Sequence, residues 1–390
     1  MTAATTPLAR VVVREDDARA LAAELAAASR VAVDLEASGM FTYRARICTV
    51  QLAWGDQVAI LDTLAAPARA LAALLGPDGP TKIVHDVSFD ARLLAEAGAP
   101  LAGVHDTSVA ARMLGHTSTG LATLLAQELD VHIQKDLQQH DWRERPLDAR
   151  MLDYLAHDVV HLASLEAKLW AQVTGRGIEA EVLEETRYRL ASAADAVREP
   201  DTRPPYARVK GVERLSERDL AALRAIADVR ESEAERRDVP PHRVASAETL
   251  VAIARARPTT VAQVLRLRGV SRGPGDAARF VDGVVRAIAE AGETLSETER
   301  ARFDRPRIPA AVLKARRDRE GRLLSWRREE AKRRDVDEQV VLPGHCVKDA
   351  AGEELREASE LARVPGLGAF RVERDGEAIL RALRGPEATP

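Results

Sequence analysis

The segment Val31-Ala-Val-Asp-Leu-Glu36 is an apolar, β-branched run that ends in two carboxylates. Side chains two positions apart in a strand point to the same side of a sheet, so Asp34 and Glu36 are predicted to lie together. Two neighbouring carboxylates repel each other unless a cation lies between them. Asp-x-Glu triplets also occur at 318–320 and 375–377. Only the triplet at 34–36 follows an apolar strand, where unpaired acids are costly, so it predicts an acidic site on a strand.

The residues around this segment indicate an α/β domain. Short β-branched runs at 10–13, 47–54 and 58–61 are typical of strands, and so is the run at 82–85, which follows a helix predicted at 65–75. From there to about residue 198 the apolar spacing becomes helical, and the leucine and valine pattern over 152–169 predicts one long helix. Strands that come first and helices that gather later predict a sheet covered by helices.

Composition excludes several classes of protein. The length of 390 residues is enough for two to four domains with cores of their own. The two cysteines, Cys48 and Cys346, lie far apart, so neither a disulfide framework nor a cysteine zinc site is encoded. No apolar run approaches the ~20 residues that a membrane helix needs, and the N-terminus lacks the features of a signal peptide. We therefore expect a cytoplasmic protein without a membrane partner.

The charge is unevenly distributed. Residues 1–200 carry 19 Lys and Arg against 28 Asp and Glu, whereas residues 201–390 carry 38 against 33. An acidic part often holds carboxylates for metal ions, and a basic part often contacts nucleic acid. A general bias of the composition towards Arg and Ala explains the same numbers without any function.

Two proline-containing breaks, at 199–206 and 304–309, divide the chain into three domains. The second and third domains have similar patterns. Each begins with a long charged helix, predicted at 216–237 and at 311–334, and continues with an Asp-Val pair at 238–239 and at 335–336. We interpret this as the internal duplication of a small helical domain. The predicted domains are 1–203, 208–295 and 308–390.

Two further features of the first domain carry chemistry. Tyr154 and Asp158 lie four apart on a predicted helix, and this is the one Tyr-x-x-x-Asp in the chain. A phenol one turn from a carboxylate can hold a water molecule, although a tyrosine at the core edge with a solvated Asp fits the pattern equally well. Asp90 lies at a predicted helix start after a strand, where sites collect in α/β sheets. Helix capping is the alternative role for Asp90, and His85 and Asp86 are nearby candidates.

In order and approximate spacing, these acids and the tyrosine resemble the three exonuclease motifs of the DEDD superfamily, tyrosine subclass. The segments Asp106-Thr-Ser-Val-Ala-Ala111 and Asp141-Trp-Arg-Glu-Arg-Pro-Leu147 are similar to those of the ribonuclease D family. The two helical stretches resemble HRDC domains, which bind nucleic acid. A histidine-type member would have His at position 153, where this chain has Asp. The resemblance implies a ribonuclease H-like α/β exonuclease domain, with a mixed sheet flanked by helices, and then two all-α HRDC-like domains.

The resemblance also implies an activity and a set of site residues. The activity is metal-dependent 3′-to-5′ hydrolysis of RNA to 5′-mononucleotides, with tRNA precursors as substrates, by a monomeric enzyme. Two divalent ions, Mg²⁺ or Mn²⁺, are implied on four acids, and Tyr154 is implied to orient the attacking water. The implied metal ligands are Asp34, Glu36, Asp90 and Asp158. The residues that could contact the terminal nucleotides are His85, Gln51, Lys135, Trp142 and Arg145. The alternatives are a role in stabilising the pocket, a core position for Trp142, and solvated surface for Lys135 and Arg145.

Other functions remain open at this point. A DNA exonuclease with the same chemistry fits the same motifs, and a catalytically silent RNA-binding scaffold would not need the complete acid set. A helicase is excluded because the chain lacks the P-loop sequence Gly-x-x-x-x-Gly-Lys-Ser/Thr. In the basic part, the arginines at 316, 317, 319 and 322 and the run 332–334 are candidates for phosphate contacts, with a solvated helix face as the alternative.

Overall fold

The computed structural model describes residues 9–133, 136–303 and 308–385. The chain forms two compact units. One unit comprises residues 1–36, 47–200 and 308–390, and the other comprises residues 37–46 and 201–307.

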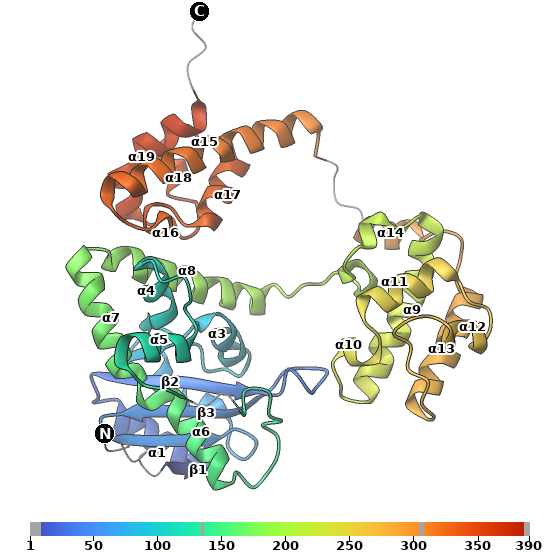
Figure 1. Cartoon of the computed structure of the whole chain (residues 1–390), viewed down its shortest axis with the longest axis horizontal. Coiled ribbons are helices and arrows are strands. Elements are labelled where there is room, and N and C mark those ends of the chain that lie inside the picture. Colours follow the sequence, from blue (N-terminus) through green and yellow to red (C-terminus); the bar gives the residue numbers. More distant parts are fainter. Residues whose placement is uncertain (1–8, 134–135, 304–307, 386–390) are drawn as a thin grey trace, which may run out of the picture. The chain divides into compact units, whose positions relative to one another are not determined.

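A six-stranded sheet forms the centre of the first domain (Figure 1). Its strands are β1 (Arg10–Val12), β2 (Arg30–Ala37), β3 (Ile47–Trp54), β4 (Gln57–Asp62), β5 (Thr81–Val84) and β6 (Val104–Asp106). The spatial order is β1-β4-β3-β2-β5-β6, with β3 antiparallel to β4 and with β1 and β4, β2 and β5, and β5 and β6 parallel. The predicted mixed sheet is therefore confirmed.

Helices pack around this sheet (Figure 1). They are α1 (Glu15–Leu25), η1 (Ala68–Leu71), α2 (Ala72–Leu75), α3 (Val87–Glu96), α4 (Thr107–Met113), α5 (Leu121–Leu129), α6 (Ala149–Val160), α7 (Leu162–Arg176) and α8 (Glu179–Arg198). The apolar residues of β3 and β4 and of α6 share a buried cluster that includes Cys48, Ile60, Trp142 and Leu155. This cluster fixes α6 against the sheet, and α6 is the helix that carries Tyr154 and Asp158.

The single long helix predicted over 152–169 is wrong. The structure has two helices there, α6 and α7, which meet at His161. His161, with φ −96° and ψ −9°, departs by about 30° from average helical angles and is both the C-cap of α6 and the N-cap of α7. The apolar spacing continues through the break because Val159, Leu162 and Leu165 are all buried. Periodicity alone therefore cannot show that the helix is interrupted.

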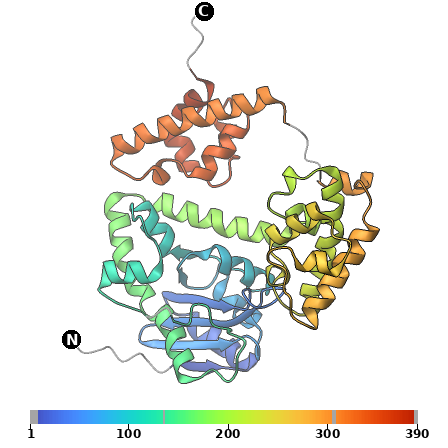
Figure 2. The same ribbon diagram turned by 45° about the vertical axis from the view of Figure 1, so that its right-hand side comes forward.

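The two C-terminal domains consist of helices among their described residues (Figure 2). The first contains η2 (Pro205–Arg208), η3 (Val212–Arg214), α9 (Glu217–Arg236), α10 (Pro241–Val244), α11 (Ala247–Ala256), α12 (Val261–Leu265), α13 (Asp276–Glu290) and α14 (Glu297–Phe303). The second contains α15 (Ala310–Arg334), α16 (Glu338–Val341), α17 (Gly344–Gly352), α18 (Ala358–Leu361) and α19 (Ala369–Arg384). The order of a long helix, three shorter ones and a final long helix recurs in both.

The repeated Asp-Val pair has the same backbone role in both domains. Asp238 and Asp335 adopt the left-handed conformation, with φ 47° and φ 52°. Asp238 follows the C-cap residue Arg237 of α9, and Asp335 is itself the C-cap of α15. The following valine N–H then donates back to a carbonyl five residues earlier: Val239 to Ala234 at 3.0 Å, and Val336 to Ala331 at 3.1 Å. This is the arrangement of a Schellman helix end, so the pair ends the long helix and reverses the chain.

Helix α8 connects the sheet domain to the second helical domain within their common unit. Glu181 on α8 accepts a hydrogen bond from Arg374 at 2.7 Å, and Glu185 pairs with His345 at 3.0 Å. The His345 ring also stacks on Tyr188, with the ring centres 3.6 Å apart. Acidic side chains of the sheet domain thus meet basic side chains of the helical domain.

The helices of the described residues include no candidate for a membrane span.

Candidate active site

Three carboxylates meet at the end of the sheet. Asp34 and Glu36 project from β2 to the same side, and Asp158 approaches them from α6. One carboxylate oxygen of each residue lies within 4.8 Å of the others. The sequence pattern predicted the two strand residues as a pair, and the structure brings the third acid to them from 122 positions further along the chain. We call these three residues the acid trio.

The acid trio has the properties of a cation site. Burial raises the pKa of Asp34 to about 7, and burial together with Asp34 raises that of Asp158 to about 8. Burial, followed by the charges of Asp34, Asp158 and Asp90, raises the pKa of Glu36 to about 9. In the absence of a cation Glu36 and Asp158 therefore hold protons at neutral pH, and Asp34 is about half protonated. All of the donor atoms are carboxylate oxygens, a set that suits Mg²⁺ or Mn²⁺.

Asp90 stands beside the acid trio and is not part of it. It lies in the first turn of α3, and its pKa is raised by burial and then by the charges of Asp34, Asp86 and Asp106. It in turn raises the pKa of Glu36. The alternative role of Asp90 as the helix cap is not what the structure shows, because the N-cap position of α3 belongs to Asp86.

Tyr154 lies one turn before Asp158 on α6. Burial and then the charges of Asp158, Glu36 and Asp34 raise its pKa well above the ordinary value for a phenol. The start of α6 is fixed by Asp148, whose side chain accepts a hydrogen bond from Met151 N–H at 2.8 Å. The hydroxyl of Tyr154 therefore stays protonated at neutral pH and faces an acidic environment.

Three side chains that were predicted to contact nucleotides instead have partners within the domain. His85 Nδ1 lies 2.8 Å from Thr107 Oγ1, and burial lowers the pKa of His85. Gln51 is fully buried, and its Nε2 donates to Thr49 Oγ1 at 3.1 Å. The ring of Trp142 is also buried and packs 5.5 Å from that of Tyr154. In this structure the three side chains support the site from within the domain.

Arg145 has a structural role. Its guanidinium forms a two-point ion pair with Asp62, at 2.6 and 2.8 Å, and also donates to the carbonyls of Cys48, Trp142 and Glu144. All five N–H donors of the group are therefore used. Lys135, the remaining predicted contact, lies outside the described residues.

Three of the four clustered arginines in the second helical domain donate to backbone carbonyls near the ends of other helices. Arg316 reaches Lys348 O at 3.3 Å, Arg319 reaches Ala351 O at 2.9 Å, and Arg322 reaches Ala382 O at 2.8 Å. A cation at a helix C-terminus compensates the partial negative charge of the unpaired carbonyls. The structure thus gives these side chains a role in packing α15 against α17 and α19.

One polar residue of this region was not predicted from the sequence to support the site. Asp106, at the end of β6, is fully buried, and its carboxylate accepts four backbone hydrogen bonds. Its position directly before a helix indicates an ordinary N-cap. Its contact with a second helix follows from the pairing of β6 with β5, which the sequence does not show.

Three stretches of the chain match known family models. Residues 9–174 match the family model described as 3′-5′ exonuclease. Residues 219–288 and 317–383 both match the model of the HRDC domain. The second helical stretch therefore matches the same domain family as the first, and this supports the predicted duplication.

Curated relatives match over most of the chain. A ribonuclease D of Granulibacter bethesdensis is 33% identical over 295 residues, which cover 73% of this chain and 72% of the relative. A ribonuclease D of Gluconacetobacter diazotrophicus is 32% identical over 67% of this chain and 66% of the relative, just under two thirds of its length. That of Escherichia coli K12 is 28% identical over 74% and 76%. All three of these relatives carry the name ribonuclease D.

Solved structures share the fold across nearly the whole length. Escherichia coli RNase D superimposes with a TM-score of 0.70 at 22% identity, covering 97% of this chain and 99% of that chain. A protein from Bifidobacterium adolescentis gives a TM-score of 0.76 at 21% identity, with 96% and 97% covered. These structures share the fold, and the curated relatives show that the chain belongs to the ribonuclease D family.

Proposed function

We propose that this protein is a metal-dependent 3′-5′ exoribonuclease that releases 5′-mononucleotides from RNA ends. The observation that carries the proposal is the acid trio, whose oxygens lie within 4.8 Å of one another and whose pKa values are raised by burial and mutual repulsion. A structural cluster of this kind would destabilise the fold for no gain. A catalytically silent scaffold has no use for it.

The residues of the chain divide the chemistry between them. Asp34, Glu36 and Asp158, with Asp90 beside them, would hold two divalent ions, Mg²⁺ or Mn²⁺. When bound, such ions act as Lewis acids that neutralise the charge on a phosphodiester and lower the pKa of water. Tyr154 keeps its hydroxyl proton because its pKa is raised, so it orients a water molecule by hydrogen bonding and does not act as a base.

The proposal for the kind of RNA that this protein cleaves comes from its relatives. The Escherichia coli protein is described as an exoribonuclease involved in structured RNA processing. We extend this to the present chain and propose structured RNA, with tRNA precursors first among the candidates, as its substrate. We further propose that the enzyme acts as a monomer in the cytoplasm, with its three domains near 1–203, 208–295 and 308–390.

The decisive experiment uses RNA and DNA oligonucleotides of one sequence, each labelled at either the 5′ or the 3′ end. The purified protein is incubated with Mg²⁺, with Mn²⁺ or with EDTA. We expect stepwise shortening of RNA from its 3′ end with either metal, and no reaction in EDTA. Internal cuts, or equal activity in EDTA, would refute a metal-dependent exonuclease. Faster degradation of the DNA strand would make the protein a DNA exonuclease with the same chemistry.

Matched variants connect the activity to the site. Asp158→Asn removes one acid of the trio and is expected to abolish activity. Asp153→Asn removes an exposed acid five positions earlier on the same helix and should leave the rate unchanged. Tyr154→Phe is expected to lower the rate by a factor on the order of 10² with unchanged RNA binding. A Tyr154→Phe variant with full activity would remove the phenol from the mechanism.

A further inference from the structure

The start of helix α3 depends on a residue of strand β6, although β5 is the strand that leads into this helix. Asp86, its N-cap residue, adopts the left-handed conformation with φ 64° and ψ 70°, and the side chain of Asp86 does not cap the helix. The first backbone N–H groups of a helix have no partners within it, so they need an acceptor from elsewhere. Asp90 lies in this first turn. Whatever binds these N–H groups therefore also fixes the position of Asp90.

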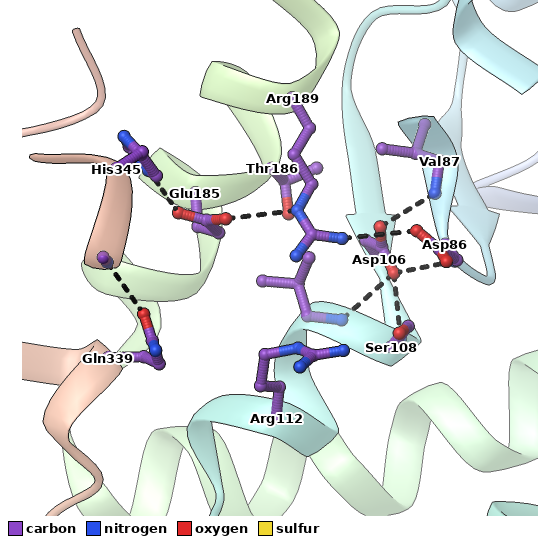
Figure 3. Close-up of polar contacts among 12 residues, drawn as sticks. Asp86, Val87, Asp106, Ser108, Arg112, Glu185, Thr186, Arg189, Gln339 and His345 are labelled. Atoms are coloured by element: carbon purple, nitrogen blue, oxygen red, sulfur yellow. Dashed lines mark hydrogen bonds and ion pairs between the residues drawn. The ribbon is translucent and has the colours of Figure 1, made fainter. Parts of the chain in front are cut away.

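Asp106 supplies the acceptor (Figure 3). Its Oδ1 accepts from Asp86 N–H at 3.1 Å, and its Oδ2 accepts from Val87 N–H at 3.0 Å. The same Oδ1 accepts from Ser108 N–H at 2.8 Å and Val109 N–H at 3.2 Å, at the start of α4. One fully buried carboxylate thus joins the N-termini of two helices. Amide donors and helix N-termini both stabilise a negative charge, which explains how an acid is tolerated there.

The position of Asp106 is itself fixed by the sheet. Asp106 pairs with Val84 in the parallel register of β6 and β5, and β5 leads directly into the turn before α3. On the other side, Arg189 of α8 contacts the Asp86 side chain at 3.3 Å (Figure 3). That ion pair is partly exposed and contributes little, on the order of 0 to 1 kcal/mol for such pairs. The buried carboxylate is therefore the dominant constraint on the helix start.

We propose that Asp106 is a positioning residue of the active site, which sets the place of Asp90 by holding the first turn of α3. The inference rests on the proposed function. Asp106 is not a catalytic residue, because both of its oxygens are used by backbone N–H groups and it lies outside the acid trio. A misplacement of about 1 Å in a catalytic group is enough to impair a reaction. Loss of the contact between Asp106 and α3 can therefore lower activity, although Asp106 does not touch the substrate.

Two substitutions separate positioning from folding. In Asp106→Asn, one side-chain oxygen becomes an NH₂ group. The remaining oxygen can replace Oδ1, but the NH₂ then faces Val87 N–H, donor against donor. In Asp106→Ser, the shorter hydroxyl still caps α4 and does not reach α3. Asp106→Asn therefore keeps the bond from Asp86 N–H but loses the one from Val87 N–H, and Asp106→Ser loses both, while each variant spares α4. Asp337→Asn is the matched control, since Asp337 caps α16 through Gln339 N–H at 2.8 Å, far along the chain from the site.

The readouts are Mn²⁺ binding by calorimetry, RNA hydrolysis at varied metal concentration, and thermal unfolding as a check of the fold. We expect a tenfold or larger loss of Mn²⁺ affinity in both Asp106 variants, as is usual when the support of a ligand is removed. The KM for RNA should stay within about twofold, and the rate should recover at high metal concentration. The Asp337→Asn protein should match the wild type in all three.

The outcomes are separable. If the wild type shows no metal-dependent hydrolysis, the proposed function fails, whatever the variants do. If the wild type is active and either folded Asp106 variant keeps wild-type Mn²⁺ affinity and metal dependence, the positioning role is overturned. If neither variant folds, Asp106 serves folding in general, and the positioning role is likewise rejected.

Discussion

Binding of a divalent ion to the acid trio should release protons, because the three carboxylates hold protons at neutral pH when no metal is bound. With pKa values of about 7, 8 and 9 for Asp34, Asp158 and Glu36, the trio carries between two and three protons at pH 7. At pH 9 it carries less than one. A metal ligand must be deprotonated, so these protons leave when the ion binds. The logarithm of the metal affinity should accordingly rise by about 2 per pH unit near pH 7 and level off above pH 9.

Calorimetric titration with Mn²⁺ in two buffers of different ionisation enthalpy measures this release directly. The difference between the two observed binding enthalpies, divided by the difference in ionisation enthalpy, gives the number of protons. We expect roughly two at pH 7 and fewer than one at pH 9. Asp153→Asn is the control, since it removes an exposed acid from the same helix and should leave the number unchanged.

The prediction has a sharp point of failure. If the enthalpy of metal binding at pH 7 does not depend on the buffer, the trio is already ionised. Burial and mutual repulsion then do not raise the pKa values of its carboxylates above 7. Asp158→Asn provides a second check, because the loss of one acid removes its own proton and relieves the repulsion on Glu36. The number released at pH 7 should therefore fall by one or more. An unchanged number would show that the protons come from groups outside the trio.

Three further predictions concern stability. In EDTA, the folded protein binds more protons than the unfolded chain between pH 4 and pH 9, since the acids of the trio have unfolded pKa values near 4. The free energy of unfolding should therefore fall as the pH rises through this range, less steeply in Asp34→Asn, and denaturant titrations at each pH measure it. Asp62→Ala should cost about 2 to 4 kcal/mol, measured by urea unfolding, because it leaves the partly buried guanidinium of Arg145 without its carboxylate. Asp335→Gly should raise the stability by up to about 1 kcal/mol, seen as a higher unfolding temperature, because glycine adopts φ 52° without strain; a lower temperature would contradict this reasoning.

The sequence predicts the parts of the site that depend on local geometry. Asp34 and Glu36 are identifiable because a strand places alternate residues on one side, and Tyr154 and Asp158 because a helix places residues four apart on neighbouring turns. The meeting of these pairs depends on the packing of α6 against β3 and β4, for which the sequence offers only apolar spacing. Their identification as one site came from the family resemblance.

The partners of two clustered arginines lie far away in the chain. Arg319 and Arg322 look like members of a basic cluster, yet their partners are carbonyls 32 and 60 positions away. Charge can be counted from a sequence, whereas the group that faces the charge cannot. Strand β6, with three residues, is too short to show a pattern, and so the role of Asp106 at its end could not be predicted either.

The left-handed Asp residues after α9 and α15 also bear on how the two HRDC domains diverged. Their arginines, loops and surfaces now differ, and one domain has gained contacts with α8 that are particular to it. The Asp-Val pair remains at the same place in both, although neither Asp caps a helix with its side chain. A backbone reversal can be inherited where side-chain contacts are not, because it needs only one residue that tolerates a positive φ. After the duplication the two domains thus kept this turn while their side-chain contacts diverged.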